Sequence, residues 1–297
     1  MMPLLISRRS VLFATATLYP AFTLPPPALA FSRAEDDVAK QLEELERQTG
    51  GRLGVSVLDT ETNISFGHRE TERFAMCSTF KALAAACALA RVDRGEEALD
   101  RPITFGRDVL LPHSPVTEKH VGGNGMTVAA LCEAAITISD NAAANLLLES
   151  FGGPAGLTSW LRSIGDETTR LDRMEPELNE AAFGDPRDTT TPAAILETLG
   201  KLAFGSVLSE SSRQQLVGWM VANKTGDARL RAGLPKDWRI GDKTGTSMTG
   251  AVSDIGFAWP DGRRPILVAA YTGEAKAPLD ILNPVFAEIG GIIAGMV

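Results

Sequence analysis

Strand-like patterns lie at the two ends of this chain and helix-like patterns fill its middle, which constrains the possible folds more than any other feature. Alternating apolar residues indicate strands near both ends, and apolar residues at helical spacing precede the first of them. The middle is rich in Ala and Leu and is broken by Gly and Pro, which indicates several helices. The elements expected at the ends are an amphipathic helix over 38–47, a hairpin over 53–66, strands over 238–246, 253–259 and 265–271, and a helix over 279–296.

Strands from both ends of a chain bury their apolar faces most simply in one shared sheet. We therefore expect an α/β plus all-α fold: an antiparallel sheet domain flanked by helices and built from both termini, with an inserted helical domain. The expected sheet domain covers 31–70 and 217–297, and the helical domain covers 71–216. With 297 residues, 44% of them apolar, the chain can fill cores of this size.

Residues 1–30 carry the features of a secretory signal peptide. The pair Arg8-Arg9 precedes an apolar stretch, and small residues lead to Ala30, after which we expect cleavage. Prolines interrupt this stretch short of the roughly 20 apolar residues that a membrane span needs, so we expect no stable membrane association. The segment 7–12 is similar to a twin-arginine export signal, but two arginines also suit an ordinary signal peptide, so both routes stay open. Either route leads to the periplasm or the medium.

Charge and metal-ligand content exclude two further functions. Lys and Arg number 29 against 37 Asp and Glu, and the net charge is -8, so we expect no nucleic-acid partner. Only three His and three Cys are present, and none has the spacing of a metal site. We therefore expect neither a metal nor an organic cofactor.

Ser78 and Lys81 lie at the start of an expected helix. The Ala/Leu run that follows them is the continuation of this helix. A spacing of three places both side chains on one helix face, where an amine can activate a hydroxyl for attack on a carbonyl. The helix N-terminus adds free N–H groups where an oxyanion would develop. Taken alone, the pattern is weak, and a Ser helix cap followed by a solvated Lys explains it better.

Two further short motifs follow in order. Ser139-Asp140-Asn141 separates two expected helices, where these residues are also typical helix caps. Lys243-Thr244-Gly245 lies in the first strand of the C-terminal group, where a Lys normally faces solvent. The ordered set is far more specific than any of its members.

This ordered set resembles the active-site elements of the class A serine β-lactamases and the related penicillin-binding proteins. A fourth element, 175–179, resembles the class A loop in which Glu175 and Asn179 hold a hydrolytic water; penicillin-binding proteins lack that Glu. Arg173 and Asp188 match the ion pair at the ends of this loop. The resemblance covers essentially the whole mature chain. It implies hydrolysis of β-lactam antibiotics through an acyl-serine intermediate, and hence resistance to them.

The resemblance also implies catalytic roles. Ser78 attacks the lactam carbonyl, and the backbone N–H groups of Ser78 and Thr246 hold the oxyanion. Either Lys81 or Glu175, acting through a water, takes the Ser78 proton, and this choice stays open. Ser139 passes a proton to the leaving nitrogen. Glu175 and Asn179 activate the deacylating water.

Further residues are implied in substrate binding. The Lys243-Thr244-Gly245 motif and Thr246 meet the anionic group of the substrate, and Asn141 binds its side-chain amide. Arg229 resembles the arginine that supplies a guanidinium to this carboxylate in some members. His113 stands where many members carry a gating aromatic, although a solvated loop His fits that place equally well.

The three cysteines depart from the patterns of the family. Cys77 resembles one half of the disulfide of carbapenem-hydrolysing members, but the partner position holds Ser247. Cys132 matches one half of another bridge, whereas Cys87 lies two residues beyond the expected partner. We expect three reduced, mostly buried thiols, with a bond between Cys87 and Cys132 left open.

Two competing functions remain in view: a penicillin-binding D,D-peptidase and a non-catalytic β-lactam sensor domain. The peptidase would lack Glu175 and need a membrane tether, and the sensor would need transmembrane helices. We expect a small-molecule β-lactam as the sole partner and a monomeric protein.

Overall fold

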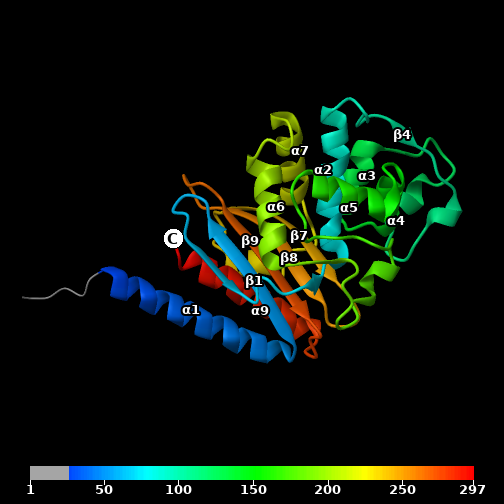
Figure 1. Ribbon diagram of the computed structural model, residues 1–297. Coiled ribbons are helices and arrows are strands. Elements are labelled where there is room, and N and C mark those ends of the chain that lie inside the picture. Colours follow the sequence, from blue (N-terminus) through cyan, green and yellow to red (C-terminus); the bar gives the residue numbers. More distant parts are fainter. Residues whose placement is uncertain (1–26) are drawn as a thin grey trace, which may run out of the picture.

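The computed structural model describes residues 27–297, and strands from both ends of this range pair in one sheet. The five strands of this sheet are β1 (Arg52–Asp59), β2 (Ser65–His68), β7 (Arg239–Thr246), β8 (Val252–Trp259) and β9 (Ile266–Gly273). They lie in the order β2-β1-β9-β8-β7, and every neighbouring pair is antiparallel. The N-terminal hairpin thus pairs with the C-terminal strands through β1 and β9, as Figure 1 shows. This arrangement confirms the expected fold class.

The remaining elements are helices, 3-10 turns and two short ladders. The helices are α1 (Pro27–Thr49), α2 (Phe80–Asp93), α3 (Val128–Thr137), α4 (Asn141–Glu149), α5 (Gly153–Ser163), α6 (Pro192–Phe204), α7 (Glu210–Val221), α8 (Leu230–Gly233) and α9 (Leu279–Ala294). The 3-10 turns are η1 (Cys77–Thr79), η2 (Arg107–Val109), η3 (Thr117–His120) and η4 (Glu177–Glu180). The ladders pair β3 (Phe74–Ala75) with β6 (Thr189–Thr190) and β4 (Pro102–Ile103) with β5 (Met126–Thr127).

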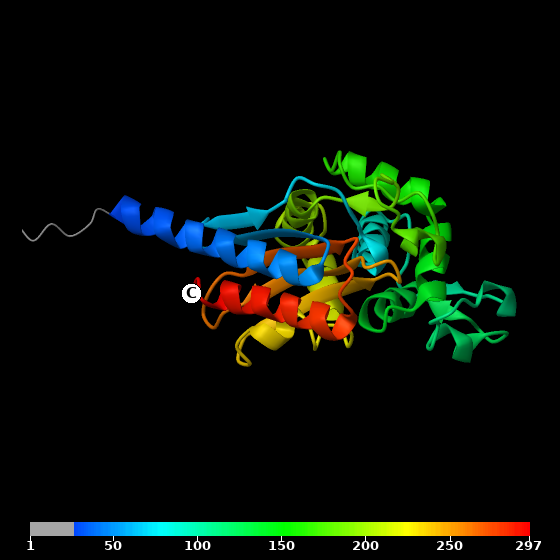
Figure 2. The same ribbon diagram turned by 90° about the horizontal axis from the view of Figure 1, so that it is seen from below.

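Helices cover both faces of the sheet, and this explains the sequences of its strands. β8 and β9 are buried along almost their whole length, because a strand covered on both faces is apolar on both. The edge strand β2 instead alternates between exposed and half-buried residues. α1 and α9 lie side by side on one face, as Figure 2 shows, and α6 and α7 pack on the other.

α2 forms the centre of the helical part and positions the catalytic motif. Its residues Phe80–Ala90 are all buried, and α3, α4, α5 and α7 contact it. The expected helix start at Ser78 needs one correction, because Cys77–Thr79 form the 3-10 turn η1 and α2 begins at Phe80. Cys77 has a positive φ of 45°, which turns the chain sharply just before Ser78.

The helical part of the chain packs directly against the sheet. α6 belongs to the sequence range expected to be helical, yet it packs on β1 and β9 of the sheet. The boundaries at residues 71 and 217 stay a prediction. Residues 1–26, and with them most of the expected signal peptide and its twin-arginine segment, lie outside the described residues.

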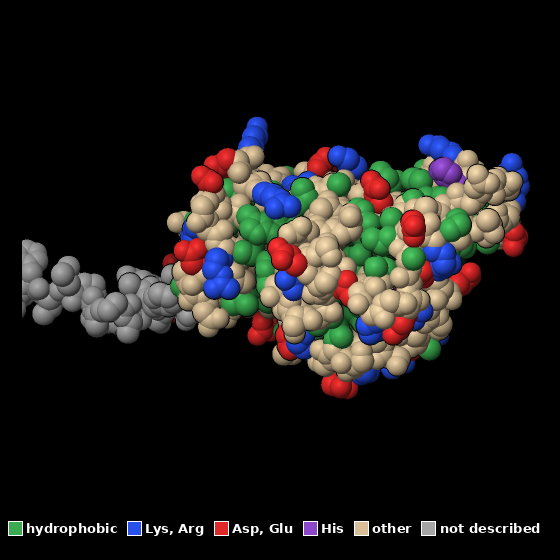
Figure 3. Space-filling view, turned by 90° about the horizontal axis from the view of Figure 1, so that it is seen from above, with side chains coloured by type: hydrophobic (Ala, Val, Ile, Leu, Met, Phe, Trp, Pro, Cys, Tyr) green, Lys and Arg blue, Asp and Glu red, His purple; other side chains and the backbone are tan. Residues whose placement is uncertain are grey.

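Two surface properties bear on the expected partners. Within 27–297, no helix has the length and apolarity that crossing a bilayer requires. Figure 3 shows one face of the molecule, on which basic and acidic side chains are interspersed rather than separated by sign.

Candidate active site

Lys81 is fully buried at the start of α2, so the alternative of a solvated Lys is wrong. Its amine donates to the backbone oxygen of Ser139 at 2.8 Å and to Oδ1 of Asn141 at 2.6 Å, and it lies 3.0 Å from Oε1 of Glu175. The Ser139 carbonyl oxygen and Oδ1 of Asn141 can only accept, so Lys81 gives an N–H to each of them. Burial lowers the pKa of Lys81, and the Glu175 carboxylate acts in the opposite direction.

A buried carboxylate positions the Ser139-Asp140-Asn141 motif between α3 and α4. Asp140 caps α4 through the N–H of Ala143 and also accepts the backbone N–H groups of Val116 and Thr117. This anchors the turn in which Ser139 adopts a positive φ of 62°. The hydroxyl of Ser139 consequently lies 3.3 Å from the Lys81 amine.

Lys243 is fully buried, although it lies on strand β7. Its amine donates to the Ser139 hydroxyl at 3.2 Å and to the backbone oxygen of Thr244 at 2.8 Å. Burial, together with the nearby charge of Lys81, lowers the pKa of Lys243 to about 7. The Ser139 hydroxyl is therefore held between two amines.

The Glu175 side chain is 2% exposed and points toward Ser78. The Ser78 hydroxyl donates to Oε1 of Glu175 at 3.3 Å, and the amide of Asn179 donates to Oε2. Oδ1 of Asn179 is buried and has no hydrogen-bond partner among the described residues. A buried acceptor of this kind is typical of a water or ligand site.

Asn145 on α4 fixes the backbone of Glu175, although no motif marks it in the sequence. Its Nδ2 donates to the Glu175 carbonyl oxygen, and its Oδ1 accepts the Glu175 N–H, both at 2.9 Å. Asn145 follows Asn141 by four residues and so shares its helix face, which is the one sequence signal that could have pointed to it.

The loop that carries Glu175 is tied at its ends. Arg173 Nε lies 2.5 Å from Asp188 Oδ2, so the expected ion pair is present. Leu178, in the middle of the loop, is fully buried in the core. The two ends of the loop are thereby joined to each other, and its centre is held in the core.

Strand β7 lies directly beside the turn that carries Ser78. A Cβ on Gly245 would come within 2.7 Å of the Met76 carbonyl oxygen, so this approach requires glycine. The next residue, Thr246, is exposed, and its hydroxyl accepts a 2.7 Å hydrogen bond from Arg229. Arg229 also donates to the carbonyl of Gly245. Its guanidinium therefore stands beside the end of β7.

His113 and Asn141 lie at the rim of this cluster. His113 is exposed, and its Nε2 lies 2.9 Å from the Ile138 carbonyl oxygen. The Asn141 N–H donates to the His113 carbonyl oxygen, and its side-chain Nδ2 donates to that of Pro112. Thr244 is paired through its hydroxyl with Thr225, 2.5 Å away.

All three cysteines are buried and unbonded. Burial raises the pKa of both the Cys77 and the Cys87 thiol to about 12, which keeps them protonated at neutral pH. The open question of a bond between Cys87 and Cys132 is thus decided in favour of free thiols. Within 27–297, no group of His, Cys, Asp or Glu could hold a metal ion.

Comparisons with known proteins agree with this geometry. The family model described as the β-lactamase enzyme family matches residues 37–296. The carbapenem-hydrolysing β-lactamase KPC of Klebsiella oxytoca is 50% identical over 79% of this chain and 80% of its own. The β-lactamase L2 of Stenotrophomonas maltophilia is 44% identical over 97% and 98%. A solved ancestral class A β-lactamase is 63% identical, with a TM-score of 0.86, over 88% of this chain and all of its own.

The fold, with its half-buried serine beside a buried lysine and a buried glutamate, defines a serine hydrolase that acts by acyl transfer. The chain belongs to the class A β-lactamases, the enzymes that hydrolyse β-lactams and confer resistance to them. Enzymes of this class are generally exported.

Proposed function

We propose that Ser78 is the nucleophile and that Glu175 takes its proton. The observation that carries this proposal is the hydrogen bond from the Ser78 hydroxyl to the buried Glu175 carboxylate. Lys81, the other possible base, gives its N–H groups to the Ser139 carbonyl oxygen and to Oδ1 of Asn141, whereas the Ser78 hydroxyl is directed to Glu175. As the Ser78 oxygen bonds to the lactam carbonyl carbon, its proton passes to Glu175.

The oxyanion then forms beside the backbone N–H groups of Ser78 and Thr246. The close approach of β7 to the turn before Ser78 supports this pairing, because it brings the two segments together. Each such donor typically lowers the barrier by about 3 kcal/mol. Breakage of the lactam C–N bond leaves a nitrogen that takes the Ser139 proton. Lys243, which donates to the same hydroxyl, lowers the cost of that transfer.

Deacylation follows by attack of a water on the ester. Glu175 and the unpartnered Oδ1 of Asn179 are the two acceptors that would orient this water. Before this step Lys81, which lies 3.0 Å from Oε1 of Glu175 and 3.3 Å from the Ser139 hydroxyl, gives a proton to Ser139 and takes the one that Glu175 gained during acylation. Glu175 then takes the proton of the water, and this proton passes to the Ser78 oxygen as that oxygen leaves. A site with this buried base turns over, whereas a D,D-peptidase or sensor domain without it stays acylated.

The substrate carboxylate is bound at the end of β7. Thr244, Thr246, Lys243 and Arg229 present hydroxyls and positive charge there, which suits an anion. Asn141 contacts the substrate side-chain amide, and His113 flanks the entrance from the neighbouring loop.

Hydrolysis of a chromogenic cephalosporin by the wild type, Ser78→Ala and Lys81→Arg tests the assignment of the nucleophile. We expect Ser78→Ala to be inert, because no ester can form, while EDTA leaves the wild type unchanged. Lys81→Arg keeps the positive charge but cannot act as a base, so clear residual acylation is expected. Loss of activity with EDTA, or turnover by Ser78→Ala, would contradict the acyl-serine mechanism.

We also propose that the mature enzyme is a periplasmic or secreted monomer released by cleavage after Ala30. The arginine pair and the small residues before Ala30 support export and cleavage. N-terminal sequencing of the exported protein tests the site, and mutation of Arg8-Arg9 to Lys-Lys tests the route, since a twin-arginine signal would lose function.

A further inference from the structure

A hydrogen bond joins the hairpin between β7 and β8 to the loop that carries Glu175. Thr249, in this hairpin, donates from Oγ1 to the Glu180 carbonyl oxygen at 3.1 Å. Glu180 directly follows Asn179. The hydrogen bond therefore joins the segment that presents Thr246 to the segment that presents Asn179.

Ser247 fixes the direction of the Thr249 hydroxyl. The Ser247 Oγ accepts the N–H groups of Thr249 and Ala251, and it lies 2.8 Å from the Thr249 Oγ1. Because Glu180 O can only accept, Thr249 must give its proton there, and Ser247 must donate to Thr249. One arrangement of protons thus satisfies the Ser247 hydroxyl, the Thr249 hydroxyl and the Glu180 carbonyl together.

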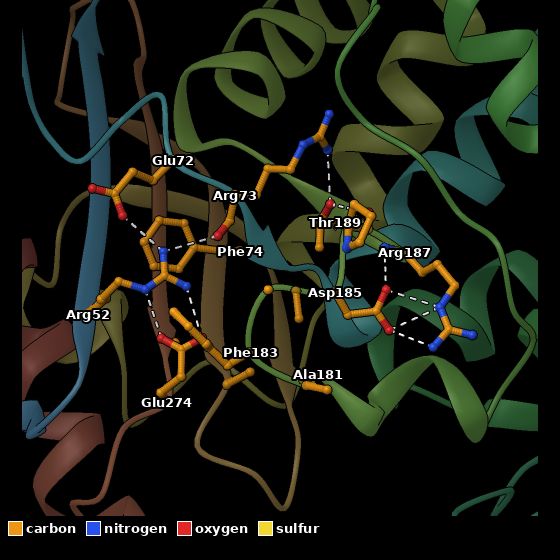
Figure 4. Close-up of a pocket in the computed structure, with 16 residues that line it drawn as sticks. Arg52, Glu72, Arg73, Phe74, Ala181, Phe183, Asp185, Arg187, Thr189 and Glu274 are labelled. Carbon is orange, nitrogen blue, oxygen red and sulfur yellow. Dashed lines mark hydrogen bonds and ion pairs between the residues drawn. The ribbon is translucent and has the colours of Figure 1, made fainter.

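Little else supports the loop just beyond this contact. Residues 181–187 form one wall of a cavity of about 430 Å³, and Arg52 and Phe74 stand on its other side, as Figure 4 shows. Phe183 in this segment is 78% exposed, whereas Leu178, before the contact, is fully buried. Core packing therefore holds the first half of the loop. The second half is held by ion pairs of Arg173 and Arg187, by the contact of the Phe183 ring with the Arg52 guanidinium, and by the Thr249 hydroxyl.

We propose that Thr249 is a positioning residue for deacylation, because its hydroxyl fixes Glu180 and, through the adjoining residue, the side chain of Asn179. The proposal rests on the proposed role of Glu175 and Asn179 in orienting the water. Acylation needs Ser78, Lys81 and Glu175, whose backbones are set by η1, by α2 and by Asn145, so it should depend less on this contact than the placing of the water does. Loss of the Thr249 hydroxyl should therefore slow deacylation more than acylation.

Thr249→Val removes the hydroxyl at nearly constant volume, and Thr249→Ser keeps it. Rapid-quench intact-mass measurements with benzylpenicillin separate acylation from deacylation. We expect Thr249→Val to deacylate about fivefold more slowly, the effect of one neutral hydrogen bond, with acylation within about twofold of the wild type. Thr249→Ser should restore deacylation. Because Thr249 is exposed, neither variant should change the melting temperature.

Two results would overturn the role of Thr249: a wild-type deacylation rate in Thr249→Val, or a Thr249→Ser variant as slow as Thr249→Val. Glu175→Gln, measured beside them, separates this proposal from the underlying mechanism. Accumulation of acyl-enzyme in Glu175→Gln together with normal deacylation in Thr249→Val rejects the positioning role alone. Normal deacylation in Glu175→Gln rejects the mechanism on which it rests.

Discussion

The Lys81 amine and the Glu175 carboxylate lie 3.0 Å apart, and both side chains are completely buried. Removing one partner of such a pair leaves an uncompensated charge in the interior, which typically costs about 3–5 kcal/mol. Lys81→Met should therefore lower the free energy of unfolding by roughly that amount. The double variant Lys81→Met/Glu175→Met should recover most of the loss, because neither charge remains. Urea unfolding measures the free energy of unfolding of the single and the double variant. A double variant less stable than Lys81→Met would contradict this account of the pair.

Lys243 should make activity depend on pH near neutrality. Its pKa of about 7 means that its charge is lost as the pH rises through this value, so kcat/KM for an anionic β-lactam should fall above pH 7. Lys243→Arg stays charged and should flatten the profile. A wild-type profile that stays level to pH 9 would exclude this role of the ammonium group.

The same pKa shift affects stability with a definite sign. The pKa of Lys243 falls from 10.5 to about 7 on folding, so between these values the unfolded chain binds more protons than the folded chain. Stability contributed by this group should therefore rise with pH across that window. The difference in unfolding free energy between the wild type and Lys243→Met, followed from pH 7 to 10, checks this sign.

Arg229 should act mainly on substrate binding. Its guanidinium touches Thr246 at the proposed carboxylate site and is 7% exposed. A charge-assisted hydrogen bond is worth about 1.5–3 kcal/mol, so Arg229→Ala should raise KM roughly 10- to 100-fold with a smaller change in kcat. Arg229→Lys keeps the charge but cannot form two parallel hydrogen bonds, so its KM should lie between those of the wild type and Arg229→Ala. An unchanged KM in a correctly folded Arg229→Ala would assign carboxylate binding to other residues.

Asn145 should control the position of Glu175 without touching substrate. Asn145→Ala leaves both the N–H and the carbonyl of Glu175 without their side-chain partner, at a cost of about 1–3 kcal/mol for each group. We expect lower stability and slow deacylation, seen as a burst followed by a slow steady rate. Asn145→Asp keeps the acceptor but loses the donor, so it should be affected less than Asn145→Ala. Equal deacylation in Asn145→Ala and the wild type would show that the loop holds Glu175 unaided.

Local sequence patterns predicted the parts of the site that depend on neighbouring residues. The spacing of Ser78 and Lys81 and the helix cap at Asp140 are short-range features, and the apolar run after Lys81 correctly indicated a buried helix. The exact start of α2 could not be read from this run, because the sharp turn at Cys77 depends on its packing against β7.

Contacts between distant segments were beyond such patterns. Asn145 binds the backbone of a residue 30 positions away, and Thr249 binds one 69 positions away. Every residue type has the same backbone carbonyl group, so the identity of the contacted residue gives no sign that a distant side chain binds it. The burial of Lys243 is similar: its strand was predicted, but the cover that α7 and Ser139 give to β7 arises only in the fold.

The central claim is that Glu175 activates the water that frees Ser78, and the most direct measurement is the mass of Glu175→Gln during reaction with benzylpenicillin. Glutamine preserves the shape of the side chain but cannot take a proton. Because Glu175 is also the proposed base for acylation, the adduct should form more slowly than in the wild type. Once formed it should persist, as one acyl group per chain on the peptide that contains Ser78, while the wild type returns to its unmodified mass. A Glu175→Gln enzyme that clears the adduct as fast as the wild type would contradict the account.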